Sequence, residues 1–361
     1  MKQASFNALT SLRHVVLGAI LSFLFIWVLS CVFVDSLVTI EYDKDLGFLV
    51  FSPNIKECHR SEGWAETTIG EHGLIGTQDV TDNNSSKIAI WGDSFVEAFQ
   101  VNDNEKMGAR VNASLRGLGF ADLIAIQIGQ SANTIADICY KLPRYEKIIP
   151  TLRAHYIVMG RLDRIFPEDG VLCRISFEPR ISIVETGFQP QMQAVKNALY
   201  RFRLDFLWYL VREDILGKKL NLAPNLIKHS SGVNSPQTTT TFRSDVSGFL
   251  LDELRARTRL PVILIWCPTV PVIKNGSVVF DDEDADKVET IMTQCEKRGI
   301  KFINMSDAFS EFYRTQKLFV RGFPNSRPAS GHLNAAGHNL VAKAITDSIL
   351  SSEEIRCFSS N

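Results

Sequence analysis

The sequence has almost no excess of charge of either sign, because its formal net charge is −1 with 22% charged residues. Binding to nucleic-acid phosphates usually needs a clustered basic surface, so the composition gives no reason to expect a nucleic-acid partner. Metal-ligand spacings are missing as well, since no Cys-x-x-Cys or His-x-x-x-His pattern occurs. No internal repeat is visible. We therefore expect no metal, no cofactor and no nucleic acid.

Cysteines are few and widely spaced. Of the seven, Cys31 lies in a long apolar run. The other six would permit disulfides in an oxidising compartment, but six cysteines allow 15 connectivities and the spacing selects none of them. Cys139 and Cys267 lie within apolar stretches. We expect these two to be buried free thiols.

Only one apolar run is long enough to cross a membrane. It extends over residues 15–34 without a charge, and at about 1.5 Å per residue it spans roughly 30 Å, the thickness of a hydrocarbon core. Lys2 and Arg13 precede it and several acidic residues follow. The positive-inside rule then places residues 1–14 in the cytoplasm and the main domain in the periplasm or outside the cell. A cleaved signal peptide is the alternative, but its apolar region is usually shorter, about 7–15 residues. A retained single-pass anchor is favoured.

The rest of the chain divides into segments of different pattern. Residues 35–86 form an approach segment with weak periodicity, and residues 351–361 form a C-terminal tail. Between them, over 87–350, short apolar strands alternate with helical segments, which predicts a parallel sheet covered on both faces. The expected strands are Ile88–Trp91, Leu123–Ile128, Tyr156–Met159, Val262–Trp266 and Lys301–Asn304, and the expected helices are 105–117, 132–150, 245–258, 283–298 and 334–350.

An interval at about 165–245 interrupts this alternation. Residues 191–213 carry apolar side chains near helical spacing, which predicts one helix with an apolar face. A polar loop and four threonines follow. We interpret the interval as an insertion that covers one side of the domain, such as a lid. A membrane-facing role for the aromatic helix is the less favoured alternative.

The chemistry begins at the first predicted strand of the domain, which ends in Trp91-Gly92-Asp93-Ser94 and leads into a helix. A serine there lies at a helix N-terminus, where free backbone N–H groups stabilise a developing anion. Asp and Ser are also common helix caps, so this motif alone is weak.

The second predicted strand ends at Gly129, whose N–H can point into the same crevice. Far downstream His332 precedes the last helix, where it can act as a general base; His338 is expected to be structural.

Together these segments resemble the SGNH hydrolase superfamily, the GDSL-type esterases and acyltransferases, over roughly residues 87–350. The resemblance rests on the blocks around Ser94, Gly129, Gly160 and His332. It implies a flavodoxin-like three-layer α/β/α fold with a five-stranded parallel sheet. It also implies that Ser94 is the nucleophile, that its N–H and that of Gly129 form the oxyanion hole, and that His332 is the base.

Two positions depart from the family pattern. The third block reads Gly160-Arg161-Leu162-Asp163, so Leu162 stands where the family has an oxyanion-binding asparagine. Three residues before His332, where the family has an aspartate, this chain has Ala329. Asn133 or Arg161 are candidate replacement donors, and Ser330 or a backbone carbonyl is a candidate orienter, which leaves a Ser–His dyad. Asp163 is not expected to be catalytic.

The sequence thus favours a serine esterase or O-acyltransferase that acts outside the cytoplasm on acylated glycans or other small esters. The anchor and the stretch from Tyr42 to Gly47 also resemble exported members associated with bacterial cell-surface polysaccharides, including relatives of the alginate-acetylation proteins. That likeness implies a polysaccharide-biosynthesis complex as a partner. The alternative, motivated by Leu162 and Ala329, is a catalytically silent SGNH-like domain that binds polysaccharide or scaffolds its biosynthesis.

Overall fold

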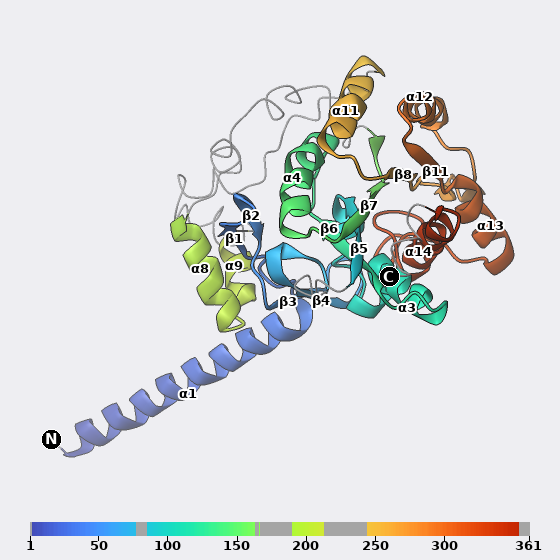
Figure 1. Ribbon diagram of the computed structural model, residues 1–361. Coiled ribbons are helices and arrows are strands. Elements are labelled where there is room, and N and C mark those ends of the chain that lie inside the picture. Colours follow the sequence, from blue (N-terminus) through green and yellow to red (C-terminus); the bar gives the residue numbers. More distant parts are fainter. Residues whose placement is uncertain (1, 77–84, 163–165, 167–189, 213–243, 354–361) are drawn as a thin grey trace. The chain divides into compact units, whose positions relative to one another are not determined.

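The computed structural model describes residues 2–76, 85–162, 166, 190–212 and 244–353 (Figure 1). The chain divides into two compact units. One comprises Met1–Thr39 with Gly187–Asn234, and the other comprises Ile40–Thr186 with Ser235–Asn361. We describe each unit by itself.

The larger unit is built on a five-stranded parallel sheet. Its strands lie in the order β11-β8-β7-β5-β6, so the first strand along the chain lies between the second and the third. This is the flavodoxin-like order, in which ligands bind outside the carboxyl ends of the strands. The predicted fold class is confirmed. The strands are β5 (Ser86–Gly92), β6 (Leu123–Gly129), β7 (Leu152–Met159), β8 (Val262–Trp266) and β11 (Lys301–Asn304).

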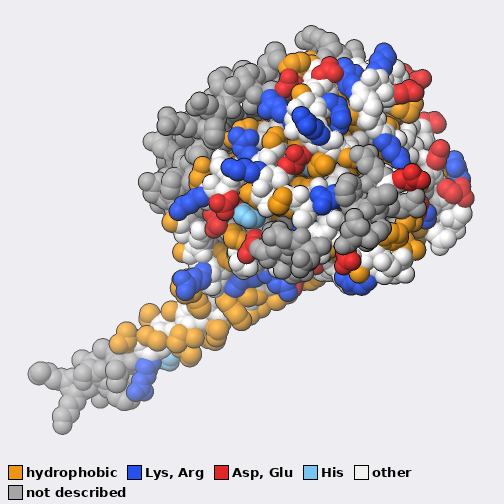
Figure 2. Space-filling view, in the orientation of Figure 1, with side chains coloured by type: hydrophobic (Ala, Val, Ile, Leu, Met, Phe, Trp, Pro, Cys, Tyr) orange, Lys and Arg blue, Asp and Glu red, His pale blue; other side chains and the backbone are white. Residues whose placement is uncertain are grey.

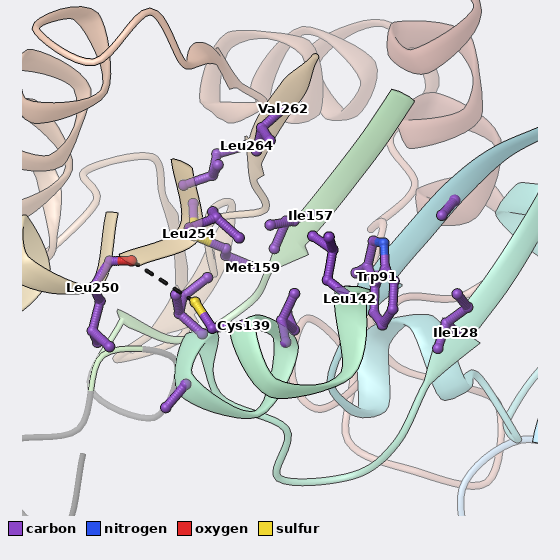
Figure 3. Close-up of a cluster of buried hydrophobic side chains, with 14 of the residues drawn as sticks. Trp91, Ile128, Cys139, Leu142, Ile157, Met159, Leu250, Leu254, Val262 and Leu264 are labelled. Atoms are coloured by element: carbon purple, nitrogen blue, oxygen red, sulfur yellow. Dashed lines mark hydrogen bonds between the residues drawn. The ribbon is translucent and has the colours of Figure 1, made fainter. Parts of the chain in front are cut away.

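Helices cover both faces of this sheet because its strands alternate between two apolar cores. In β5, Ala89 and Trp91 face the core with α4 (Ile135–Ile148), α11 (Ser244–Arg257) and α12 (Ala285–Glu296). Figure 3 shows part of this core, where the Cys139 thiol points to the carbonyl of Leu250 at 3.9 Å. Ile88 and Ile90 face the opposite core, which is completed by α3 (Met107–Gly117), α13 (Ser306–Gln316) and α14 (Ala335–Leu350).

The approach segment is folded more extensively than its sequence suggests. It forms two antiparallel hairpins followed by a short 3₁₀ turn, η1 (Glu71–Gly73). Phe48, Val50 and Leu74 from this segment are buried in the same core as α4. These four strands were not predicted from the sequence. The hairpin strands are β1 (Ile40–Asp43), β2 (Phe48–Phe51), β3 (Ile55–His59) and β4 (Ala65–Ile69).

Three smaller elements complete the described part of the larger unit. A short helix, α2 (Ser94–Glu97), follows β5, and a 3₁₀ turn, η2 (Asp103–Glu105), precedes α3. A small hairpin, β9 (Val272–Lys274) with β10 (Ser277–Val279), lies between β8 and α12.

The smaller unit contains the N-terminal helix α1 (Lys2–Phe33), of which Ser11–Phe33 is long and apolar enough to cross a membrane. Hydrophobic side chains gather along the surface of this helix (Figure 2). The helix expected over 191–213 is two helices, α8 (Pro190–Arg201) and α9 (Asp205–Arg212). They are separated at Arg203, whose positive φ of 52° interrupts helical geometry.

The described part of the insertion is joined to the end of α1 by two hydrogen bonds. Phe206 N donates to Ser30 Oγ at 2.9 Å, and Leu37 N donates to Asp205 Oδ1 at 3.0 Å. The rest of the interval 165–245 lies outside the described residues, except Phe166 and the start of α11. The expectation of a lid therefore stays a prediction.

The described cysteines are free thiols, and Cys139 and Cys267 are buried as predicted. Burial raises the pKa of each of these two thiols to about 12. Cys173 and Cys357 lie outside the described residues.

Candidate functional site

Ser94 is the first residue of α2 and is separated from the end of β5 only by Asp93, so it lies at a strand end and helix start as the sequence predicts. Asp93 caps this turn, because its Oδ1 accepts a hydrogen bond from Phe95 N at 3.0 Å. The aspartate next to the serine thus holds the turn in shape. The serine lies half-buried at the carboxyl end of the sheet, where this fold class binds ligands.

Gly129 lies beside the same turn. It pairs with Gly92 in the parallel ladder between β5 and β6. A Cβ at position 129 would overlap the backbone of Val96 and Glu97 in α2. Glycine is therefore required there by close approach, and the end of β6 is held against the turn that carries Ser94. The oxyanion role of Gly129 stays a prediction.

His332 is held by a carboxylate from a distant part of the chain. Its Nδ1 lies 2.5 Å from Glu62 Oε2, and its backbone N–H donates to Glu62 Oε1 at 2.9 Å. Both side chains are largely buried, with 27% and 20% of their surfaces exposed. Burial acts to raise the pKa of Glu62, but the hydrogen bonds and charge of His332 outweigh it and lower that pKa below its usual value. At neutral pH the histidine therefore faces an ionised carboxylate.

The residue before His332 makes this contact possible. Gly331 has a φ of 74°, and a Cβ there would overlap Glu62 Oε1. Glycine thus provides both the left-handed conformation and the room for the carboxylate.

The His332 ring lies next to the turn that carries the serine. Its centroid is 5.8 Å from that of Phe95, the residue after Ser94. Within the described part of the chain, no hydrogen bond joins Ser94 Oγ to the imidazole. Hydrogen bonds between catalytic groups are often long until substrate is bound. The structure therefore brings the His332 ring beside the Ser94 turn, while the proton transfer between them remains a proposal.

Arg321 is a further residue of this region that the sequence did not indicate. Its buried guanidinium donates to the carbonyls of Cys267 at 2.7 Å and Gly331 at 3.0 Å. Its Cζ also lies 4.5 Å from the centroid of the Phe95 ring. Burial lowers the pKa of Arg321 to about 10, so it stays charged at neutral pH. Arg321 ties the segment before His332 to the end of β8, and no sequence spacing signals such a pairing.

Glu97 is a second buried ionisable group near the site. Its carboxylate accepts a hydrogen bond from the backbone N–H of Ser131. Burial raises the pKa of Glu97, and the hydrogen bonds from Ser131 only partly offset this. The contact links α2 to the turn after β6, and it therefore supports the position of Gly129.

The candidate replacement donors differ in their surroundings. Asn133 Nδ2 donates to Gly92 O at 3.2 Å, and its Oδ1 accepts from Lys141 Nζ at 2.7 Å, so the amide supports the backbone before Ser94. Arg161 follows β7 and is exposed. Leu162 is 1% exposed and packs in the core with α4. It offers no donor.

Ser330, the candidate orienter, and Ala329, which stands where the family has an aspartate, lie close to His332 in the sequence. Ser330 Oγ donates to Arg327 O at 2.9 Å, and Ala329 is buried with a φ of 58°. Nδ1 of the imidazole faces Glu62 instead. Asp163 lies outside the described residues.

His338 lies in a different environment from His332. It is buried, and its Nδ1 faces the backbone N–H of Met107 at 3.3 Å. Burial lowers its pKa to about 3, so the ring is neutral and accepts this hydrogen bond at the start of α3. This is a structural position, as the sequence analysis expected.

Among the described residues, one group has metal-ligand atoms within 4.8 Å of one another: Asp43, Asp45 and His72. His72 Nδ1 already lies 2.7 Å from Asp43 Oδ2, and Asp43 Oδ1 accepts hydrogen bonds from the backbone of its own turn. The group thus closes the β1–β2 hairpin onto η1.

No protein-family model matches this sequence, and no curated protein is similar to it. Solved structures with a similar arrangement include acetyl xylan esterases. A catalytic mutant of the acetylxylan esterase Axe2 from Geobacillus stearothermophilus shares 14% identity, with a TM-score of 0.38 over 75% of this chain and 98% of that one.

Two further structures are similar at the same level. The acetyl xylan esterase AlAXEase shares 14% identity, with a TM-score of 0.37 over 73% of this chain and 99% of the other. LAE5, an alpha/beta hydrolase from the metagenome of Lake Arreo in Spain, shares 16% identity, with a TM-score of 0.38 over 74% of this chain and 97% of the other.

Proposed function

We propose that this protein is a serine esterase in which Ser94 is the nucleophile, His332 the general base and Glu62 the carboxylate that orients the base. The contact between His332 and Glu62 is the observation that carries the proposal. An imidazole held through Nδ1 by a carboxylate keeps Nε2 free to accept a proton, which is the arrangement of serine hydrolases. The carboxylate comes from the loop between β3 and β4.

The reaction follows from these positions. Ser94 Oγ attacks the ester carbonyl while its proton moves to His332 Nε2, and Glu62 stabilises the imidazolium that forms. The backbone N–H groups of Ser94 and Gly129 bind the tetrahedral oxyanion. His332 then protonates the leaving alcohol as the C–O bond breaks. A water molecule, or a sugar hydroxyl in a transfer reaction, attacks the acyl-enzyme by the reverse of these steps.

The sizes of two possible losses in turnover favour an active enzyme, although Leu162 provides no oxyanion donor. Loss of one oxyanion donor costs about 10²–10³ in turnover, whereas an imidazole in the wrong tautomer costs about 10⁴. Glu62 holds the imidazole in the required tautomer and so avoids the larger of these two losses in turnover. We therefore expect a slow but working enzyme.

The substrate follows from the resemblance in sequence and from the anchor. We infer a retained membrane helix with its N-terminus in the cytoplasm, which places the esterase domain in the periplasm or outside the cell. Acylated glycans are the proposed substrates there, with a polysaccharide-biosynthesis complex as a proposed partner. A catalytically silent binding domain is the second candidate, and it is favoured by the buried, donorless side chain of Leu162.

A fluorophosphonate probe tests the chemistry directly. The full chain in lipid nanodiscs is incubated with the probe and, separately, with p-nitrophenyl acetate. Labelling and turnover should both be lost in Ser94→Ala and retained in Ser114→Ala, an exposed serine on α3. Absence of both in the wild-type protein, or labelling that survives Ser94→Ala, would refute the esterase.

A further inference from the structure

A cavity of about 610 Å³ lies between the β3–β4 loop and the segment that precedes His332. It is lined by neither Ser94 nor Gly129. Aromatic and apolar side chains form most of its walls, and amide side chains interrupt them. The lining residues used below are Trp64, Gln100, Glu105, Leu318, Phe323 and Asn325.

The two walls of this cavity are tied together by Asn325. Its Oδ1 accepts from Gly63 N at 2.8 Å, and its Nδ2 donates to the carbonyls of Arg60 and Gly63, both at 2.8 Å. One amide side chain thus satisfies three backbone groups of the β3–β4 loop. The cavity is therefore preformed, which lowers the entropic cost of binding a ligand.

Trp64 offers a flat apolar surface at the mouth of this cavity. It is 56% exposed, so much of the indole is available to stack against a ligand. The Arg60 guanidinium lies 4.7 Å from its ring centroid. Arg60 is itself fixed, since its Nη1 donates to His59 O at 2.9 Å and Ala65 O at 2.7 Å. The indole is thus supported by a fixed neighbour while much of its surface faces solvent.

Gln100 lines the cavity and carries an acceptor that the described residues leave unused. The residue is 8% exposed, and its Oε1 is buried without a hydrogen-bond partner among the described residues. A buried polar atom without a partner is costly, so a ligand hydroxyl that donates to it would gain a favourable hydrogen bond. The terminal amide torsion is soft, so a small rotation presents this oxygen to a bound hydroxyl.

From these observations we infer that the cavity binds a neutral sugar ring. An apolar ring face stacks on Trp64 while a ligand hydroxyl donates to Gln100 Oε1. An acyl chain would leave that oxygen buried without a partner. An anionic ligand would meet the carboxylate of Glu105, which also lines the cavity. A sugar ring with one apolar face and hydroxyl donors at its edge fits both the indole of Trp64 and the oxygen of Gln100.

The cavity is connected to the proposed catalytic residues through the chain itself. Glu62 directly precedes Gly63 and Trp64, so the loop that holds the imidazole also forms the binding platform. The inference rests on the proposed esterase and specifies its substrate: a glycan that occupies the cavity with one ring while a neighbouring acylated ring reaches Ser94.

A direct measurement of saccharide binding tests this site independently of catalysis. The full chain carrying Ser94→Ala, in lipid nanodiscs free of sugar detergents, is titrated with cellotetraose, xylotetraose and chitotetraose by saturation-transfer NMR. At least one of these should bind. Trp64→Ala should weaken that binding roughly tenfold or more, and Gln100→Leu should weaken it at nearly constant side-chain volume. Leu118→Ala, an exposed apolar residue at the end of α3, should leave it unchanged.

Other outcomes overturn either the sugar site or the esterase on which it rests. Binding of none of the three saccharides, or binding that survives Trp64→Ala, refutes a sugar site, and preferential binding of octanol would assign the cavity to an acyl chain. Trp64→Phe should retain part of the binding, which guards against a variant that merely misfolds. Saccharide binding without Ser94 labelling refutes the esterase alone, whereas labelling without saccharide binding refutes this site alone.

Discussion

At the scale of single residues, the site depends on a pairing that joins positions 270 apart in the sequence. Ser94 and His332 were recognisable because each stands in a local pattern, a strand end or a helix start. Glu62 has no such pattern. It lies in a short loop among other polar residues, and only the pairing of β3 with β4 and the turn at Gly331 bring it to the imidazole. Glu62, the carboxylate proposed to orient the imidazole, could not be located by spacing from His332.

We predict that Glu62→Gln lowers kcat for p-nitrophenyl acetate by about 10²–10⁴ with little change in KM. The glutamine amide can donate to Nδ1, which favours the tautomer that carries its proton on Nε2 and cannot accept one from Ser94. Steady-state kinetics of the full chain measure both parameters. Glu62→Asp keeps the charge and should retain more of the activity. A kcat within about twofold of wild type in Glu62→Gln would show that the carboxylate does not orient the base.

At the scale of elements, the buried parallel strands and their covering helices were predictable, whereas the hairpins before them were not. Val262–Trp266 and Lys301–Asn304 have the predicted bounds. Val262–Trp266 is buried throughout and is a continuous apolar run, as expected for an internal strand of a parallel sheet. The helix α13 was not predicted, although Phe309, Phe312 and Tyr313 recur at helical spacing within it. The elements that carry Glu62 and Trp64 belong to the hairpins, so the site was less predictable than the sheet that supports it.

Lys106 lies just before α3 and is hydrogen-bonded to β4 and to the segment after α2. Its titration should make the free energy of unfolding depend on pH. Its Nζ donates to Thr67 Oγ1 of β4 at 2.8 Å and to the carbonyl of Val101 at 2.7 Å, and it also donates to the carbonyl of Ala98 after α2. Burial lowers the pKa of Lys106 to about 7, although Asp103, Glu97 and Glu105 act in the opposite direction. Its value in an unfolded chain is about 10.4.

Between those two pH values the unfolded chain binds a proton that the folded chain has lost, so the free energy of unfolding rises with pH. Below about pH 7 both states are protonated and the contribution is constant. We predict that wild-type stability rises, relative to Lys106→Met, by a few kcal/mol between pH 7 and about pH 10. Thermal unfolding of both proteins across this range measures the difference. Parallel stability profiles would mean that the lysine has an ordinary pKa in the folded protein.

At the scale of the whole molecule, the chain combines an apolar helix with an α/β domain of flavodoxin-like strand order, and the insertion contributes to the unit that contains the apolar helix. This grouping was not predictable, since it depends on hydrogen bonds between residues 168 and 176 positions apart. The apolar face of 191–213 predicted helix but could not identify what that helix packs against. The contact of α9 with the end of α1 supports the less favoured alternative, in which the aromatic helix faces the membrane.

Asp205 makes this association testable. It is fully buried, and its Oδ1 holds the backbone N–H of Leu37, just beyond the end of α1. Asp205→Ala leaves that N–H without its partner, and a lost hydrogen bond of this kind costs on the order of 1 kcal/mol or more. We predict that amide exchange at Leu37 and at the start of α9 becomes roughly tenfold faster in the full chain in nanodiscs.

The matched control is Asp347→Ala, which removes an exposed aspartate that pairs with Lys343 on α14. It should leave exchange at Leu37 unchanged, because an exposed ion pair contributes little to stability. In both variants β5, β6 and β7 should exchange as in the wild type, since their ladder lies in the other unit. If exchange at Leu37 in Asp205→Ala equalled that of the wild type, α9 would not be held to the end of the apolar helix.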